Sequence, residues 1–500
     1  MIIEGSFRNF CIGALTFLLS SGFAVNPAKG QETELIVDIA DSAVEEQIAE
    51  LRSRFGVYAV RNVPELDAEI WAVANDRIAD LFEATRNSET VSAIDYLGFD
   101  QRSLFIGVPE LAQLSTEQVS RLADIEADEA MEGVQLLRLR AGEFGQRLLS
   151  AASANGQTNP QPSSLLFNFG LDGQFLASRT RFRELANGVT EWTGSLTLPG
   201  NDMQQGTAFL VIDGDDVLGR ISSEDGEYLI QSIGDGYHAV AEIDSSAGPP
   251  DHDEEYEELL EDDVEKLQDA VNLEDLEAAA TGDGRIGIGF LFDSSGMAAI
   301  RRRQQSAAQF TSFVLHGGNQ IFQSSGATAE MYIAGIEYLD RDLFGSLRSQ
   351  LLAIADPKSL DHAPVGEWRG RIGADIVVLV TERTRPCGYA LDILPEAAMS
   401  FVAVSAACAI KYNSLTHEIG HVLGLTHHNE AGLPALPFGR GYRLNAELGT
   451  LMALRHTVRR RAPRWSSPEP PYQEQTIGVH DSFDSVRAIN TTARIVSEYR

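Results

Sequence analysis

Four of the ten histidines in this chain lie within residues 416–430, which read THEIGHVLGLTHHNE. His417 and His421 are four residues apart, so a helix would place both imidazoles on one face, within reach of one cation. Gly424 can adopt a positive φ, end that helix and turn the chain back. His427 would then approach the same cation as a third ligand. Three histidines leave the fourth position of tetrahedral zinc open for water, which is typical of a catalytic site.

Glu418 lies between the first two histidines in sequence and points about 100° away from His417 around a helix. This direction disfavours a role as a ligand but lets the carboxylate reach a water on the zinc. The zinc lowers the pKa of that water, and Glu418 would take its proton and later pass it to a leaving amine. The alternative is an amphipathic helix with incidental histidines. Three His, one Glu and one Gly at fixed offsets are far rarer by chance than His-Glu-x-x-His alone, which favours one catalytic zinc ion.

The N-terminal residues predict export. An apolar run from Phe10 to Leu19 has the length of a signal-peptide core and is too short to span a bilayer, and small residues precede a cleavage point after Ala24. We therefore expect a cleaved signal peptide over residues 1–24 rather than an uncleaved anchor. The protein would be secreted, to the periplasm or the medium, without a stable membrane span.

The cysteines fit the same compartment. Cys11 would leave with the signal peptide, so the exported chain keeps only Cys387 and Cys408. An even pair of cysteines in an exported protein predicts one disulfide. Two reduced, buried thiols are the alternative.

The net charge of −34 is unevenly distributed along the chain. Residues 1–283 hold 17 Lys and Arg against 53 Asp and Glu, whereas residues 284–500 hold 22 against 20. This acidity argues against nucleic acid as a partner and indicates two parts with different roles. The acidic run at 251–283 predicts a solvated linker. An acidic segment that shields a site or loads it with calcium is the alternative, and no calcium motif supports it.

The part of the chain before the acidic run contains three segments with different sequence patterns. Residues 34–73 predict the order strand, helix, strand, strand, and residues 115–151 have helical spacing. Between residues 163 and 244, short alternating runs are separated by turn residues. We expect a β-sandwich-like module there.

Beyond residue 284 the pattern alternates between strands and helices, which is typical of an α/β domain. Asn413 or Ser414 can cap a helix that carries the histidine cluster. The expected strands cover residues 285–293, 328–339, 374–382 and 399–409, and the other expected helices cover residues 297–322, 341–355 and 485–500.

The segment HEIGHVLGLTH matches the metzincin pattern His-Glu-x-x-His-x-x-Gly-x-x-His of zinc endopeptidases. The chain resembles the reprolysin-like bacterial branch, including the peptidyl-Asp metalloendopeptidases, across residues 285–500. The resemblance implies a metzincin-like α/β (α+β) catalytic domain at 284–500, with a mixed twisted sheet, an active-site helix and a Met-turn. The acidic linker at 251–283 would precede it. Residues 25–250 would form a β-rich propeptide-like region, since residues 165–245 resemble the propeptide of the same enzymes.

The resemblance also assigns roles to residues outside the motif. Met452 would form the Met-turn beneath the zinc, and a Cys387–Cys408 disulfide would fix the rim of the cleft. The strand that contains MSFVAVSA would be the sheet edge that binds substrate in extended form. His428 occupies a position where relatives usually carry Asp, so its role is an open question.

Two further features bear on regulation and specificity. Residues 25–283 contain no cysteine, which excludes a cysteine switch as the mechanism of latency. Arg459, Arg460 and Arg461 follow the expected Met-turn and could form a basic pocket for acidic substrate residues. A solvated surface cluster is the alternative.

These observations together predict a secreted zinc-dependent endopeptidase that is made as a zymogen. Its substrates would be proteins or peptides, and its own N-terminal region would serve as intramolecular inhibitor and folding aid. The rival hypothesis is a catalytically inactive binding or adhesion protein on a metzincin-like scaffold. The presence of all three histidines and Glu418 favours the enzyme.

Overall fold

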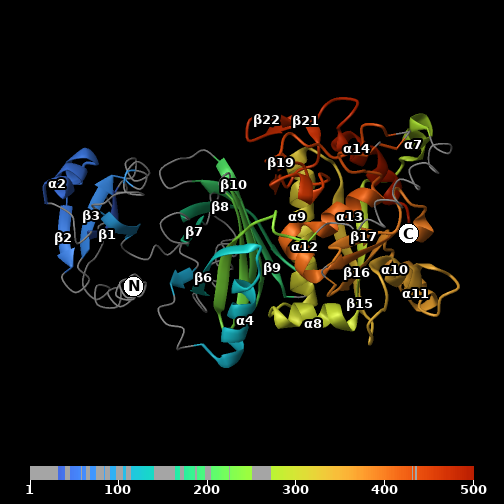
Figure 1. The fold of residues 1–500 in the computed structure, drawn as a ribbon, viewed down its shortest axis with the longest axis horizontal. Helices are drawn as coiled ribbons and strands as arrows, with labels where there is room; N and C mark the ends of the chain where they lie inside the picture. Colours follow the sequence, from blue (N-terminus) through green and yellow to red (C-terminus); the bar gives the residue numbers. More distant parts are fainter. Residues whose placement is uncertain are drawn as a thin grey trace, which may run out of the picture. The chain divides into compact units, whose positions relative to one another are not determined.

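The computed structural model describes two compact units, which we consider separately (Figure 1). One unit comprises residues up to 125 and residues 133–242, and the other comprises residues 126–132 and the chain from 243 onwards. The described residues are 32–39, 45–57, 59–63, 68–74, 81, 84, 91–96, 105–107, 114–139, 164–168, 174–185, 188–197, 204–223, 226–249 and 272–500, the last range without 384, 431, 434 and 435.

Some of the expected segments fall outside these residues. The predicted signal peptide at 1–24 lies outside them, as do residues 251–271 of the acidic linker. Among the described residues, no helix combines the length and the apolar character that crossing a bilayer requires.

The first unit begins with a small antiparallel sheet in the order β2-β3-β1-β4. Helix α2 lies between β1 and β2 in sequence, so residues 34–73 have the strand, helix, strand, strand order that their sequence predicts. Trp71 on β3 and Ile48 on α2 are buried in one apolar cluster with Phe55. The elements are β1 (Glu32–Ile39), α2 (Glu45–Arg54), β2 (Ala59–Val63), β3 (Ala68–Ala74) and β4 (Val91–Tyr96).

The larger sheet of this unit has the order β5-β6-β13-β12-β11-β10-β9-β8-β7. From β7 to β13 each strand pairs with the next in sequence, so no strand passes to a second layer. The predicted β-sandwich is therefore wrong, although the predicted hairpins are present. The strands are β5 (Phe105–Gly107), β6 (Met131–Leu139), β7 (Ser164–Asn168), β8 (Gln174–Glu184), β9 (Thr190–Thr197), β10 (Gln204–Asp213), β11 (Asp216–Ser223), β12 (Glu227–Gly234) and β13 (Tyr237–Ile243).

Within the described residues 115–139, the helical prediction for residues 115–151 is correct over α4 (Thr116–Glu126), and residues 140–151 lie outside the described part of the chain. The chain then enters β6, which lies between β5 and β13 in the sheet. Val134 packs with the cluster around Leu122, whereas Leu137 belongs to the main core of the sheet. Pairing and packing on both faces of β6 outweigh its helical propensity.

The second unit is built on a five-stranded sheet in the order β15-β14-β16-β18-β17 (Figure 1). Neighbouring strands are parallel except β17, which pairs with β18 in the antiparallel direction. The mixed α/β class predicted for this region is confirmed. The strands are β14 (Arg285–Phe292), β15 (Glu330–Tyr338), β16 (Ile376–Thr381), β17 (Gly388–Ala390) and β18 (Phe401–Ser405).

The predicted edge strand is wrong. β18, which contains the FVAVS sequence, is an interior strand between β16 and β17. The short strand β17 forms the edge instead. It carries a glycine and only three residues, too weak a pattern to identify a strand from sequence alone.

The helices of this unit differ from the prediction at their ends. The single helix expected at 297–322 is two helices, because Gln304 has a φ of 55° and Ser306 caps a new start. α10 begins only after the Ser346 cap, α11 was not expected, and residues 406–409 continue into a helix rather than a strand. The main helices are α7 (Leu273–Ala279), α8 (Ser294–Arg302), α9 (Ala307–Ser325), α10 (Leu347–Ala355), α11 (His362–Ile372), α12 (Ala406–Tyr412), α13 (Ser414–Val422) and α14 (Ser485–Val496).

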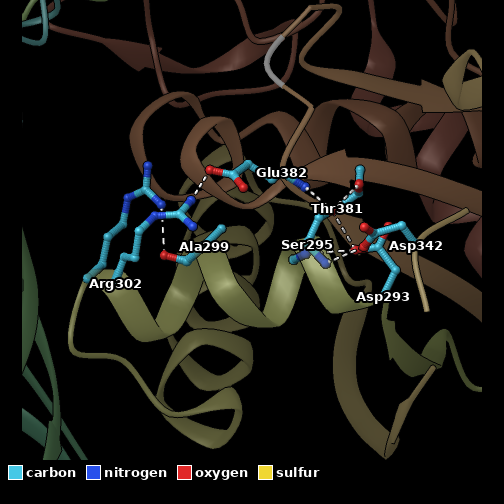
Figure 2. Close-up of polar contacts among 9 residues, drawn as sticks. Asp293, Ser295, Ala299, Arg302, Asp342, Thr381 and Glu382 are labelled. Atoms are coloured by element: carbon cyan, nitrogen blue, oxygen red, sulfur yellow. Dashed lines mark hydrogen bonds and ion pairs between the residues drawn. The ribbon is translucent and has the colours of Figure 1, made fainter. Parts of the chain in front are cut away.

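Side chains at the start of α8 attach this helix to the end of β16 (Figure 2). The buried carboxylate of Asp293 accepts hydrogen bonds from the Gly296 N–H and the Ser295 hydroxyl. The Ser295 hydroxyl also lies 3.1 Å from that of Thr381, the last residue of β16. Arg302 pairs with Glu382 at the other end of the helix. These contacts fix β16, the strand that supports β18 and the helices that follow it.

A buried histidine makes the larger sheet of the first unit sensitive to acid. His238 on β13 is fully buried, and its Nε2 accepts a hydrogen bond from the Val217 N–H at 3.0 Å. Its Nδ1 lies 3.1 Å from the Gly236 carbonyl oxygen, to which it donates. Burial lowers the pKa of His238 from 6.5 to about 4, so the folded sheet keeps the ring neutral.

We predict that this sheet loses stability as the pH falls from about 6.5 to about 4. In that window the unfolded chain gains a proton on His238 that the folded state excludes, so the loss reaches about 3 kcal/mol. Hydrogen exchange of the β11 and β13 amides at several pH values measures it. His238→Gln, which does not titrate, should flatten the pH dependence over this window. An equally steep dependence in the variant would contradict the prediction.

Candidate metal centre and catalytic site

Helix α13 carries the first two histidines of the cluster. It follows α12 directly, and Asn413 between them has a φ of 55°, which redirects the chain by a sharp turn. Asn413 makes no side-chain capping bond, so it marks the predicted helix start by its backbone alone. Every residue of α13 is buried, including His417 and His421. The histidines therefore lie inside the unit, where a metal can replace water as their partner.

Gly424 brings the third histidine back to the helix. It has a φ of 82°, a conformation that favours glycine, and its N–H donates to the His421 carbonyl at 2.8 Å. The next N–H, of Leu425, donates to the Gly420 carbonyl at 2.9 Å. These bonds close the last turn of the helix and reverse the chain, so that the fully buried His427 faces the two helical histidines.

The three imidazoles converge through their Nε2 atoms. The Nε2 atoms of His417 and His427 are 3.3 Å apart, and one ligand atom from each of the three rings lies within 4.8 Å of the others. Each Nδ1 has its own acceptor. The acceptors are the Leu451 carbonyl for His417 at 3.0 Å, the Leu425 carbonyl for His421 at 2.9 Å and the Glu430 carboxylate for His427 at 2.6 Å.

This arrangement fits a zinc ion. An Nδ1–H that donates to oxygen leaves Nε2 as a lone pair, so lone pairs face one another in a buried space. A cation between them removes that repulsion. In a tetrahedral site with Zn–N bonds of about 2.0 to 2.1 Å, two nitrogen ligands lie about 3.3 to 3.4 Å apart, which matches the His417–His427 distance.

Glu418 is fully buried on the same helix and lies against the edge strand β17. A Cβ atom added to Gly388 would lie only 2.4 Å from the Glu418 Oε1 atom. A larger residue at this point of β17 would therefore displace the Glu418 side chain. The same contact brings the carboxylate to the sheet edge, where an extended peptide can pair with the strand.

Met452 packs directly beneath the helix. It is 1% exposed, and a Cβ atom added to Gly420 would lie 2.9 Å from its sulfur. The Ala453 N–H donates to the Thr450 carbonyl at 2.9 Å, which closes a tight turn around the methionine. The Leu451 carbonyl in this turn accepts the His417 Nδ1–H. The turn thus holds the His417 ring through the Leu451 carbonyl, and its methionine fills the space below Gly420 of the helix.

Cys387 and Cys408 form a disulfide with a Cα–Cα distance of 5.5 Å. The bond joins the residue before β17 to helix α12. It therefore holds the edge strand and the segment that leads into α13 at a fixed separation. Both cysteines are buried.

Glu430 is a site residue that the sequence prediction missed. Its carboxylate accepts hydrogen bonds from the Nδ1 and the backbone N–H of His427, at 2.6 and 2.9 Å. Burial favours the neutral acid, but the interactions with His427, which include these two bonds, outweigh burial and lower the pKa of Glu430 to about 2. An acidic residue three positions after the third histidine was the available signal, although the loop geometry that directs it inward was not.

His428 provides an anchor for the turn that contains Met452. Its Nδ1 accepts a hydrogen bond from the Leu454 N–H at 3.3 Å. Burial, together with repulsion from Arg443, lowers the pKa of His428 to about 4, so the neutral ring can act as an acceptor. A neutral histidine here performs a task for which an acidic side chain would also be suitable.

The three consecutive arginines do not form one exposed pocket wall. Arg459 is exposed and pairs with Glu447, and Arg460 donates to the Gln473 side chain. Arg461 is buried, and its guanidinium donates to the backbone carbonyls of Leu451 and Tyr412, each at 3.3 Å. These contacts separate the three side chains into different environments.

Comparison with known proteins agrees with this geometry. Residues 307–428 match the family described as Metallo-peptidase family M12B Reprolysin-like, a span that contains all three histidines and Glu418. The reprolysin-like resemblance is therefore confirmed for this part of the chain.

Relatives with the same kind of name align over a longer region. A peptidyl-Asp metalloendopeptidase of Xanthomonas campestris pv. campestris is 27% identical over 375 residues, which cover 70% of this chain and 88% of that protein. One of Stenotrophomonas maltophilia strain R551-3 is 26% identical over 352 residues, 66% of this chain and 82% of that protein. The family match and these relatives support a zinc metalloendopeptidase.

The similarity to a solved structure is weaker than the similarity to these relatives. Metalloproteinase-II from Bacteroides fragilis aligns with 64% of this chain and 91% of its own, at 11% identity and a TM-score of 0.35. A score of this size supports no argument about the arrangement of the whole chain.

We predict that Glu430→Ala weakens zinc binding by about 10- to 100-fold, because His427 loses the acceptor that fixes its ring. Competition against a chromophoric chelator measures the affinity. Glu447→Ala is the matched control, since Glu447 is an exposed acid in the same region and lies on the protein surface. Equal affinities of the Glu430 variant and the wild type would contradict the prediction.

Proposed function

We propose that the chain is an exported zinc endopeptidase, made as a zymogen, that cleaves proteins or peptides. The observation that carries this proposal is a group of three buried histidines whose ligand atoms lie within 4.8 Å of one another, with the buried Glu418 on the same helix as two of them. Glu418 reaches the edge strand at Gly388. A metal, a base and a peptide-binding strand at one place are the parts that peptide hydrolysis requires.

His417, His421 and His427 would hold one zinc ion, with Met452 and its turn as support. When bound, zinc polarises a carbonyl and increases the acidity of water. Glu418 takes the proton of the attacking water on a carboxylate oxygen as the oxygen adds to the scissile carbon. The same oxygen then donates this proton to the leaving amine as the C–N bond breaks.

The substrate would bind as an added antiparallel strand on β17. In the strand order of the described residues, β17 is the last strand of the sheet and pairs with β18, and an extended peptide would add beyond it. Gly388 has no side chain to keep the peptide backbone away from Glu418. Backbone pairing of this kind favours peptides over small-molecule substrates.

Residues 1–24 would direct export, and the region upstream of the acidic linker would act as inhibitor and folding aid. The alignment with the Xanthomonas relative covers 375 residues, more than residues 284–500 contain, so the likeness extends into the upstream region. The absence of cysteine between residues 25 and 283 requires a different inhibitory group. Relatives named for peptidyl-Asp cleavage support a preference for acidic residues.

A catalytically inactive binding or adhesion protein on the same scaffold is the alternative function. It would bind zinc and peptide without hydrolysis. The fully buried Glu418 favours the enzyme, because a buried carboxylate beside the metal site costs free energy that a binding protein has no need to retain.

We predict that Glu418→Ala keeps its zinc and loses at least about 10²- to 10⁴-fold in peptide hydrolysis, since only the proton acceptor is removed. Bound zinc, casein cleavage and self-processing are measured side by side, with Glu447→Ala as the control. If the wild type and the Glu418 variant both bind zinc and neither cuts casein, with or without the first 283 residues, the protein is not a protease.

We also predict that Gly388→Ala lowers kcat/KM by about 100-fold without loss of zinc. The added Cβ displaces the Glu418 carboxylate, and a misplacement of about 1 Å is enough for such a loss. Gly370→Ala is the matched control, because nothing lies within 4 Å of a Cβ added there. Normal kinetics of the Gly388 variant would show that the contact does not position Glu418.

A further inference from the structure

Three cationic side chains surround Tyr412 at the start of the active-site helix. The Lys411 ammonium lies 5.2 Å from the centre of the Tyr412 ring, and the Arg455 guanidinium lies 4.0 Å from it. Arg461 donates to the Tyr412 carbonyl at 3.3 Å. Tyr412 and the two arginines are buried. We refer to Lys411, Tyr412, Arg455 and Arg461 as the Tyr412 cluster.

The cluster borders the catalytic site through two of its members. Arg461 donates to the Leu451 carbonyl at 3.3 Å, and the same carbonyl accepts the His417 Nδ1–H. Arg455 lies 3.9 Å from the Cys387 sulfur, and Cys387 precedes the glycine that contacts Glu418. A residue next to a scissile bond at Glu418 could therefore place its side chain near these cations.

Groups from upstream of the acidic linker already occupy the cluster. The Asp128 carboxylate forms an ion pair with the Lys411 ammonium. The Pro249 carbonyl accepts a hydrogen bond from Arg455 at 3.0 Å. Asp128 and Pro249 both belong to the compact unit that contains the catalytic site.

The two upstream segments are held together and fit closely. The Asp244 N–H donates to the Ala130 carbonyl at 3.0 Å, which joins residues 126–132 to residues 243–249. A Cβ atom added to Gly248 would lie 2.2 Å from an Arg455 nitrogen and 2.7 Å from the Tyr412 ring. The upstream chain thus presents a carboxylate and a peptide carbonyl, the same two groups that an aspartyl residue of a substrate would present.

We infer that the Tyr412 cluster is the subsite for an acidic substrate side chain, with Lys411 and Arg455 as its cationic groups. Asp128 and the Pro249 carbonyl occupy that subsite in the full-length chain and keep substrate out. This inference rests on the proposed function and deepens it by naming the residues that select an acidic side chain. It also supplies an inhibitory contact that needs no cysteine.

The first test measures the preference for acid. The zinc-loaded full-length chain, left to process itself, is given paired peptides that differ only by Asp or Asn after the scissile bond. The wild type should prefer the Asp peptide by about tenfold or more in kcat/KM, since charge-assisted hydrogen bonds are the stronger class. Lys411→Met and Arg455→Met should each reduce this ratio towards one. The surface variant Arg459→Met should keep it. Unchanged ratios in both cluster variants would overturn the inference.

The second test does not depend on hydrolysis. In the full-length chain with Glu418→Ala, labelling of Lys411 by an amine reagent is followed by mass spectrometry, with exposed Lys358 as the internal reference. Asp128→Asn should speed the labelling of Lys411 by about tenfold, and added N-acetyl-aspartate should slow it again. N-acetyl-asparagine at the same concentration should not. Equal rates with the acid and the amide would overturn the inference, even if the enzyme proves active.

The two tests separate failure of the subsite from failure of the proposed function. Selective protection of Lys411 by the acid, in a chain that cuts no peptide, would support an acid-binding subsite on an inactive protein. Peptide cleavage without acid preference and without acid protection would support the protease and reject the subsite.

Discussion

The structure around the site depends on three buried imidazoles whose ligand nitrogens face one another. Two of these nitrogens are 3.3 Å apart, a distance that matches two ligands of one tetrahedral zinc ion. Fixing the lone pairs requires that every Nδ1 proton have an acceptor elsewhere. Two backbone carbonyls and one carboxylate supply the acceptors, so the path of the main chain is part of the metal site.

Two turns of the main chain supply the carbonyl acceptors for the Nδ1 protons of His417 and His421. The reversal at Gly424 ends α13, returns His427 to the helix and presents the Leu425 carbonyl to His421. The turn around Met452 presents the Leu451 carbonyl to His417 and is tied by Leu454 to His428, beside the third histidine. A shift of either turn would therefore move two histidines. Both turns are buried, and this packing keeps their backbones in place although neither belongs to the sheet.

The sequence predicted the parts of the site that depend on local geometry. The spacing of His417 and His421 reflects helical periodicity, and Gly424 reflects a backbone conformation, so both could be recognised from their residue types. Glu430 was missed because its role depends on the fold of a loop. The order of the strands could not be predicted from local periodicity either. The sequence FVAVS is apolar enough to be a strand, but only its pairing with GYA shows that this strand is interior.

Longer-range packing also explains the errors upstream. Residues 131–139 have helix-forming composition, yet they lie between two strands and pack on both faces, a context that no window of sequence contains. The break at Gln304 has a local cause instead, since the caps at Asp293 and Ser306 begin separate helices where the periodicity of the sequence continues. Sequence patterns identify a helix or strand well when only one of its faces is buried. They identify it poorly when both faces are buried.

The charge distribution of the chain acquires a physical meaning at the Tyr412 cluster. Residues 284–500 are nearly neutral overall, but two of their cations lie over the Tyr412 ring and a third, Arg461, donates to the Tyr412 carbonyl. The upstream part carries the large acidic excess and contributes Asp128 to that cluster. Cleavage of the acidic linker alone would not break the contact between Asp128 and Lys411. That contact is a direct ion pair between the two side chains and does not depend on an intact linker. Release of the subsite would then require dissociation or destruction of the upstream fragment, and salt would favour it by screening the partly exposed ion pair.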